Sequence, residues 1–132
     1  MEKINIKTNK RTELLDITAK IEDVLLRSKI VNGSCVVFCP HTTAGLTINE
    51  NADLMVTKDI LDTLGKLIPQ DAAYSHQEGN SDSHLKASFM NPSLQIIIED
   101  AKLCLGTWQG VYLCEFDGPR MRQVWVKIFK DN

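Results

Sequence analysis

The sequence has few of the features that mark membrane, nucleic-acid-binding or secreted proteins. Its apolar runs are far shorter than the ~20 residues that span a bilayer, so we expect no membrane segment and no membrane partner. No block of like charge occurs and the formal net charge is −2, which argues against a nucleic-acid partner. Residues 1–7 contain no apolar stretch of the length that a secretory signal needs, so we expect no such signal.

Cysteine is also scarce, and its spacing does not form a known metal or redox motif. The chain has Cys35, Cys39, Cys104 and Cys114, and no two of them form a CxxC pair. Three of the four lie inside apolar runs that are typical of strands. We therefore expect reduced, buried thiols in a cytoplasmic protein.

Repeats, low-complexity tracts and linkers rich in proline or glycine are absent, which predicts one domain over residues 1–132. A chain of this length can bury about two thirds of its unfolded surface, which is enough for a hydrophobic core. Apolar runs that alternate or are β-branched, bounded by turn residues, predict strands. The predicted strands lie at 4–6, 11–16, 34–39, 46–48, 94–99, 107–116 and 123–129.

Apolar residues at helical spacing predict two helices. The first covers about 18–29, and Thr18 is in position to cap its N-terminus. The second begins after Asn51 or Asp53, either of which could cap it, and ends before Pro69.

The strands predicted at 107–116 and 123–129 are apolar on both faces, so both faces must be covered. Two helices cannot cover so large a sheet, which predicts packing of one sheet on another or burial at a subunit interface. We expect Trp108 to lie in the core or at such an interface. Gln109 and Glu115 stand among the apolar residues and predict a buried polar network.

Histidine is the clearest candidate for a functional residue. There are only three histidines, His41, His76 and His84, and all lie in polar runs, at 40–51 and 76–84. Scarce imidazoles among carboxylates, amides and hydroxyls suggest one shared metal or acid–base site. The alternative is that they are separate, solvated loop histidines.

The segment 70–83 supports the shared site, because it has no periodicity and is long for a connection in a compact domain. Three histidines, or two with Glu50, Glu78 or Asp82, would supply the three ligands that catalytic zinc commonly takes. Zinc or magnesium could activate water or hold phosphate oxygens there. Without a metal, a histidine oriented by one of these carboxylates could act as general acid or base.

Hydroxyl and amide side chains near the histidines are candidates for binding substrate. Thr43 follows His41 closely, and Thr47 and Asn49 share one face of the strand predicted at 46–48. Asn80 adds an amide to the second polar run. The alternative is an ordinary half-buried strand with its polar face in water. Glu50 could likewise serve as a base or only favour the N-terminus of the next helix.

Two further motifs carry turn residues. In 117–122, Arg120 and Arg122 share strand parity and could together bind a phosphate or pyrophosphate. The alternative is a plain turn with surface arginines. In 105–110, two glycines flank Trp108, which predicts a bulge or a close backbone approach.

Three motifs together resemble the YjbQ family of small cytosolic proteins. They run from His41 to Asn51, from Glu78 to Lys86 and from Leu105 to Gly110, and the resemblance covers nearly the whole chain. Departures from the family pattern are Asn91 and Ala101 in place of glycine and Leu54-Met55 in place of Pro-Asp.

The resemblance implies an α+β fold, a mostly antiparallel β-sandwich with two helices, assembled as a homotrimer. It implies thiamine-phosphate synthase activity, which joins a pyrimidine pyrophosphate to a thiazole phosphate and releases pyrophosphate. It places His41, His76 and His84 in a metal or anion site near a subunit boundary, with a small phosphorylated metabolite as partner. Two alternatives stay open, a metal-assisted hydrolase of a small phosphorylated or cyclic metabolite and a non-catalytic trimer that binds a metal or metabolite.

Overall fold

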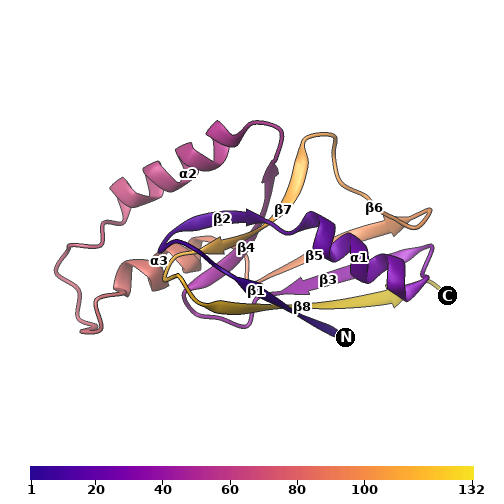
Figure 1. Ribbon diagram of the computed structural model, residues 1–132, viewed down its shortest axis with the longest axis horizontal. Helices are drawn as coiled ribbons and strands as arrows, with labels where there is room; N and C mark the ends of the chain where they lie inside the picture. Colours follow the sequence, from indigo (N-terminus) through magenta and orange to yellow (C-terminus); the bar gives the residue numbers. More distant parts are fainter.

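The computed structural model describes all 132 residues and arranges eight strands and three helices in two antiparallel sheets (Figure 1). The larger sheet has the order β1-β8-β3-β5-β6, and the smaller has the order β2-β7-β4. The larger sheet consists of β1 (Glu2–Lys7), β8 (Met121–Lys130), β3 (Gly33–Phe38), β5 (Ser93–Glu99) and β6 (Lys102–Leu103). The smaller consists of β2 (Glu13–Asp16), β7 (Gln109–Glu115) and β4 (Ala44–Glu50), and the helices are α1 (Thr18–Ser28), α2 (Leu54–Leu67) and α3 (Ser81–Phe89).

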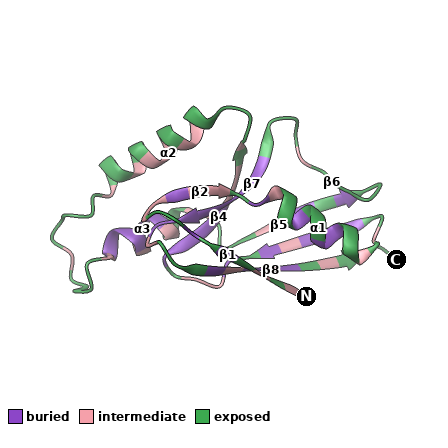
Figure 2. Cartoon of the chain, viewed as in Figure 1, coloured by how far each residue is buried: buried purple, intermediate pink, exposed green.

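The main core lies between the two sheets and beneath α1, which confirms the predicted packing of sheet on sheet. A single cluster of 16 buried residues draws on both sheets and on this helix. Figure 2 shows buried residues alternating with less buried ones along β3, β5 and β8, as expected where one face of a strand points inward. The α+β fold predicted from the sequence is therefore present.

Strand β7 is covered on both faces, as predicted. Val111 and Leu113 belong to the main core, whereas Tyr112 and Phe116 belong to a second cluster on the other face of the small sheet. Side chains of α2 and α3 pack against this second cluster. Trp108 just before the strand is 62% exposed, so within one chain it does not lie in the core.

The outer face of the larger sheet is not covered by any element of the chain. It presents exposed apolar side chains from three strands, which are Phe38, Ile97, Met121 and Phe129. Phe38 also stacks on Trp125 of β8, with ring centroids 5.7 Å apart.

The helix ends differ from the prediction in one respect. Thr18 does not cap α1 but is its first residue, and Asp16 accepts hydrogen bonds from the Thr18 backbone N–H and hydroxyl. The Thr18 hydroxyl in turn accepts from the Val111 N–H of β7, which fastens the helix start to the small sheet. The α2 cap is Asp53, one of the two predicted residues, whose carboxylate accepts from the Met55 N–H.

Helix α3 was not predicted, and its first residues fall in the segment expected to be irregular, 70–83. Its buried residues are all polar, namely Ser81, Asp82, Ser83 and Lys86. A search for apolar residues at helical spacing cannot find a helix that buries a polar face. The short strand β6 was also not predicted.

An ion network replaces apolar packing on the buried face of α3. Arg11 donates two hydrogen bonds to Asp82, at 3.0 and 2.9 Å, and Lys86 donates a third at 2.9 Å. The Asp82 side chain is fully buried and that of Lys86 nearly so. Ser83 adds a hydrogen bond to the Phe116 carbonyl at the end of β7. This network fixes how α3 sits on the small sheet.

Burial alone would raise the pKa of Asp82, but the hydrogen bonds from Arg11 and Lys86 outweigh it and hold the pKa at about 2. Because the folded-state pKa lies below the usual 3.8, the carboxylate contributes stability above about pH 4. That contribution is lost as the pH falls through about 2. A difference of this size corresponds to about 2 kcal/mol.

We expect Asp82→Asn to lower the free energy of unfolding at pH 7 by about 3 kcal/mol, because it leaves the buried Lys86 ammonium without a counter-ion. Urea denaturation at pH 7, 4 and 2 should show the deficit shrinking toward pH 2. Asp59→Asn, on the exposed side of α2, is the control and should change stability by less than about 0.5 kcal/mol. Equal losses in the two variants would contradict the role given to Asp82.

Candidate functional site

A polar cavity of about 360 Å³ lies where three distant segments of the chain meet. They are the loop after β3, the residues that lead into α3 together with the first turn of that helix, and the turn between β7 and β8 together with the start of β8. None of the ten lining residues has an apolar side chain except Pro40. The lining residues are Pro40, His41, Thr42, Thr43, Glu78, Asn80, His84, Asp117, Arg120 and Arg122.

Most of the residues predicted for the site meet in this cavity. Among the histidines, His41 and His84 line it, and His76 lies beside it. Glu78, Asn80, Thr43 and both predicted arginines line it as well.

Besides His76, four predicted residues are not among the lining residues. Thr47, Asn49 and Glu50 follow β4 away from its first residue, Ala44, which is near the cavity. Asp82 is turned into the ion network of α3, where Arg11 and Lys86 neutralise it. In the structure Asp82 positions α3, and the catalytic role suggested by the sequence stays a prediction.

Arg122 is held beneath the cavity by a fully buried carboxylate. Its Nε donates to Glu115 at 2.9 Å, its Nη2 donates to the other Glu115 oxygen, and Nη2 also donates to the Thr43 hydroxyl at 2.8 Å. The Thr8 hydroxyl donates to Glu115 as well, at 2.8 Å. Glu115 thus forms the buried polar network predicted for it, whereas Gln109 is exposed and accepts from the Gly106 N–H.

These contacts decide the charge of the pair. Burial would raise the pKa of Glu115, but hydrogen bonds from Arg122, from the Asp117 N–H and from Thr8 outweigh it and leave the pKa below its ordinary value. Glu115 is therefore ionised at neutral pH, and the guanidinium of Arg122 has a fixed position and a fixed partner.

His41 is held in one tautomer by the backbone of β8. Its Nε2 accepts a hydrogen bond from the Gln123 N–H at 2.9 Å, so the ring proton of the neutral form is on Nδ1. Burial and the nearby charge of Arg122 lower the pKa of His41 below 6.5. At neutral pH, His41 is therefore a neutral hydrogen-bond donor.

Asp117 was not predicted as a site residue, although it belongs to the predicted turn. It accepts from the Asn80 Nδ2 at 2.9 Å and pairs with Arg120 at 3.2 Å. Arg120 is exposed, and its Nε also donates to the Asp117 carbonyl. The Asp117 carboxylate thus connects the residue before α3 to the only exposed arginine of the cavity.

The arrangement of a single chain gives no support to the predicted zinc or magnesium ion. No three histidine, cysteine or carboxylate side chains of the chain are grouped so that they could hold a metal ion. His41 in particular uses the lone pair of Nε2 for Gln123. His76 and His84 stand edge to face with ring centroids 5.4 Å apart, and Glu78 lies 3.7 Å from His76 Nε2. A metal site built on all three histidines stays a prediction without support from the arrangement of one chain.

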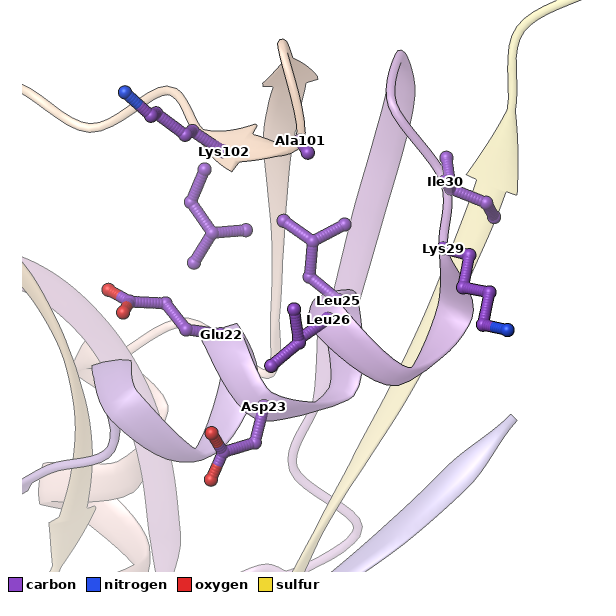
Figure 3. A pocket seen from close by; sticks show the side chains of 9 residues that line it. Glu22, Asp23, Leu25, Leu26, Lys29, Ile30, Ala101 and Lys102 are labelled. Atoms are coloured by element: carbon purple, nitrogen blue, oxygen red, sulfur yellow. The ribbon is translucent and has the colours of Figure 1, made fainter.

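A larger cavity lies elsewhere and has a different character. It measures about 710 Å³ and lies between α1 and the Ala101–Lys102 segment (Figure 3). Its walls include Leu25, Leu26 and Leu103, and none of the predicted site residues lines it. The predicted residues His41, His84, Arg120 and Arg122 line the polar cavity instead.

No helix of the protein has the length and hydrophobicity needed to cross a membrane. The predicted free thiols are present, with Cys35, Cys39 and Cys114 buried as expected and Cys104 exposed.

Comparison with known proteins finds a single family over the whole chain. A family model described as UPF0047 protein YjbQ-like matches residues 2–131. UPF0047 protein MJ1081 from Methanocaldococcus jannaschii is 54% identical over 130 residues, 98% of this chain and 94% of that protein. UPF0047 protein YugU from Bacillus subtilis is 46% identical over 129 residues, 97% of this chain and 98% of that protein.

Solved structures have the same fold. A YjbQ/UPF0047 protein from Clostridium acetobutylicum, described as uncharacterized, matches with a TM-score of 0.96 and 53% identity, covering 98% of this chain and all of that one. SSO2532 from Sulfolobus solfataricus, described as YbjQ-like and of unknown function, matches with a TM-score of 0.93 and 32% identity, covering 98% and 96%.

We expect His41→Gln to change how stability depends on pH. Because the folded-state pKa of His41 is lowered, wild-type stability should fall as the pH drops below 6.5 and His41 gains a proton. The glutamine carbonyl can still accept from Gln123 but does not titrate, so this part of the acid dependence should disappear. Urea midpoints between pH 7.5 and 5 test this, with the exposed His76→Gln as control. Identical pH profiles for wild type and His41→Gln would contradict the environment described for His41.

Proposed function

Since the chain belongs to the YjbQ/UPF0047 family, we propose that its polar cavity binds the phosphate groups of a small phosphorylated metabolite and supports thiamine-phosphate synthase activity. The observation that carries the proposal is the grouping of two arginines and two histidines in a cavity with an almost wholly polar lining. Guanidinium and imidazole N–H groups are the donors that proteins use for phosphate oxygens.

The two arginines would play different parts. Arg122 cannot leave its buried partner Glu115, so it supplies a positive potential at a fixed place. The side chain of Arg120 contacts only Asp117, within its own turn, and can exchange these contacts for a phosphate. Arg122 would thus be a preorganised cation, and Arg120 would move onto the ligand. Together they would stabilise a leaving group that gains negative charge during the reaction.

Neutral donors complete the proposed phosphate site. The Nδ1–H of His41, the hydroxyl of Thr42 and the Asn80 side chain belong to residues that line the cavity. Asn80 also precedes the first turn of α3, and the partial positive charge of a helix N-terminus favours an anion nearby.

The chemistry that this arrangement suits is departure of pyrophosphate. In the synthase reaction, the bond between the pyrimidine methylene carbon and the pyrophosphate oxygen breaks, and the pyrophosphate keeps the electron pair. A new bond forms between the methylene carbon and the thiazole nitrogen. Arg120 and Arg122 would stabilise the charge that develops on the leaving oxygen, and such electrostatic stabilisation is usually the largest single contribution to catalysis.

We expect Arg120→Ala to lower kcat/KM for pyrophosphate release by roughly 10- to 100-fold, since a charge-assisted hydrogen bond is worth about 1.5–3 kcal/mol. Arg120 is exposed, so the variant should fold normally. The assay follows pyrophosphate release in the presence of both the pyrimidine pyrophosphate and the thiazole phosphate. Arg27→Ala is the matched control, because Arg27 is exposed and pairs with Glu2 outside the cavity.

Two results would count against the proposal. Absence of pyrophosphate release by the wild-type protein with both substrates would exclude the synthase activity. Equal rates and equal pyrophosphate affinities for wild type and Arg120→Ala would exclude the role of Arg120.

We further propose that the chain assembles as a homotrimer, as the family resemblance implies. None of the 14 residues of α2 is buried, and Leu54 and Leu67 are 74% and 73% exposed. Figure 1 shows α2 lying along the edge of the molecule. Isolated helices of this length are marginal in water, so a further covering surface would stabilise α2. The uncovered outer face of the larger sheet offers a second apolar surface.

Sedimentation equilibrium should therefore give three times the chain mass of 14.8 kDa. Leu67→Glu should shift the distribution toward monomer, because a charge replaces an apolar side chain at the proposed contact. Leu26→Glu is the control, since Leu26 is similarly exposed, at 77%, but lies on α1. A wild-type monomer, or equal dissociation in the two variants, would contradict the proposed assembly.

A further inference from the structure

A second hollow of about 330 Å³ adjoins the polar cavity. Its lining comes from the segment before α3 and from the first turn and a half of that helix. His84 is the one residue that lines both spaces, so its imidazole forms a wall between them. The residues that line the hollow are Tyr74, Ser75, His76, Ser81, His84 and Leu85.

The two spaces differ in chemistry. The polar cavity offers charged and hydroxyl groups. The hollow instead has the flat rings of Tyr74, His76 and His84, with Leu85 as an apolar contact. The two imidazoles stand nearly perpendicular, at 87°. Flat ring faces with a few polar atoms are typical of sites for planar, aromatic ligands.

Ser81 gives the hollow an unused polar group. Its hydroxyl oxygen is buried and has no hydrogen-bond partner. A buried hydroxyl without a partner is costly, so such groups are rare unless a ligand or water satisfies them. A hydroxyl can both donate and accept, which suits a ring nitrogen or an exocyclic amine.

Access to this hydroxyl requires only a small change of the wall. The His76 side chain is 44% exposed, and its contacts are a 3.7 Å approach to Glu78 and the edge-to-face contact with His84. Because the His76 imidazole is not part of the core, a change of its rotamer would widen the hollow toward the first turn of α3 without unpacking the core.

We propose that the hollow is a ring-binding compartment that accepts an aminopyrimidine, while the phosphate groups of the same molecule occupy the polar cavity. This inference rests on the proposed function for the phosphate half and adds the place and chemistry of the other half. His84 then lies beside the bond that joins ring and phosphate. A thiazole offers the Ser81 hydroxyl only a ring nitrogen, whereas an aminopyrimidine offers both a ring nitrogen and an exocyclic amine, so Ser81 would favour the pyrimidine substrate over the thiazole in this compartment.

The three histidines allow each space to be observed separately. Their imidazole Hε1 signals can be assigned by NMR with single His→Gln variants. Inorganic pyrophosphate should shift the signals of His41 and His84, which line the polar cavity. The neutral probe 4-aminopyrimidine should shift those of His76 and His84 and leave His41 unchanged.

Ser81→Ala tests the hydroxyl itself. We expect it to weaken 4-aminopyrimidine binding about tenfold and to leave pyrophosphate binding unchanged, since loss of one well-placed hydrogen bond costs on the order of 1 kcal/mol. Ser88→Ala is the matched control, because Ser88 is on the same helix but is exposed. The far-ultraviolet circular dichroism of both variants checks that α3 is retained.

The outcomes separate this inference from the proposed function. If pyrophosphate shifts His41 and His84 but 4-aminopyrimidine shifts neither His76 nor His84, the ring compartment is wrong and the phosphate site stands. If 4-aminopyrimidine binds equally to wild type and Ser81→Ala, the role of Ser81 is wrong. If pyrophosphate shifts none of the three signals, the proposed phosphate site fails, and the claim that one molecule spans both spaces fails with it.

Discussion

The buried ion pair between Glu115 and Arg122 is the interaction on which the candidate site depends. Removing two charges from water is costly, and only complete hydrogen bonding compensates for it. Here the carboxylate accepts from Thr8, from the Asp117 N–H and from two nitrogens of Arg122. The pair therefore joins the end of β7, the start of β8 and the residue after β1 at one point. The turn that carries Arg120 and Asp117 is held at this point, because the Asp117 N–H donates to Glu115 and the Arg120 N–H donates to Thr8.

A second ion network, around Asp82, places the other wall of the cavity. It connects to the first through the segment between β1 and β2. From that segment, Thr8 contacts Glu115 and the Arg120 backbone, while Arg11 contacts Asp82 and accepts from the Gly118 N–H. A side chain at Gly118 would meet the Lys10 carbonyl at 2.2 Å, so the two backbones can approach only without one. The segment between β1 and β2, which contributes no lining residue, thus sets the distance between the cavity walls.

The parts of the fold that follow from apolar patterning were predictable, and the parts that follow from polar burial were not. The periodicity of α1 and α2 and the two-faced pattern of β7 express contacts between apolar side chains, which sequence spacing records directly. Helix α3 buries Asp82 and Lys86, and their partner Arg11 is distant in sequence. No local pattern contains that partner, so the helix and the ion network of Asp82 emerge only from the tertiary structure.

Site residues in loops could be predicted from the sequence, whereas the position of those along β4 could not. Polar runs rich in histidine, arginine and amides indicated the three segments that meet in the cavity. Thr47, Asn49 and Glu50 of β4 belong to the same polar run as His41, but they do not line the cavity. A strand rises about 3.3 Å per residue, so Glu50 lies roughly 20 Å along the strand from Ala44. Proximity in sequence therefore indicates proximity in space within a loop but not along a strand.

The hydrogen bond between His41 and β8 has a wider consequence. The register of β3 and β8 ends with Phe38 opposite Trp125, and the imidazole of His41 then accepts from Gln123, two residues earlier on β8. A side chain thus continues a ladder where the backbone of β3 has stopped. A protonated imidazole cannot accept a hydrogen bond. Protonation of His41 would therefore break its bond to the Gln123 N–H and remove the hydrogen bond that continues the ladder between β3 and β8 at this end of β8. The environment of the Gln123 amide proton, in a strand, therefore depends on the protonation state of His41, which lines the neighbouring cavity.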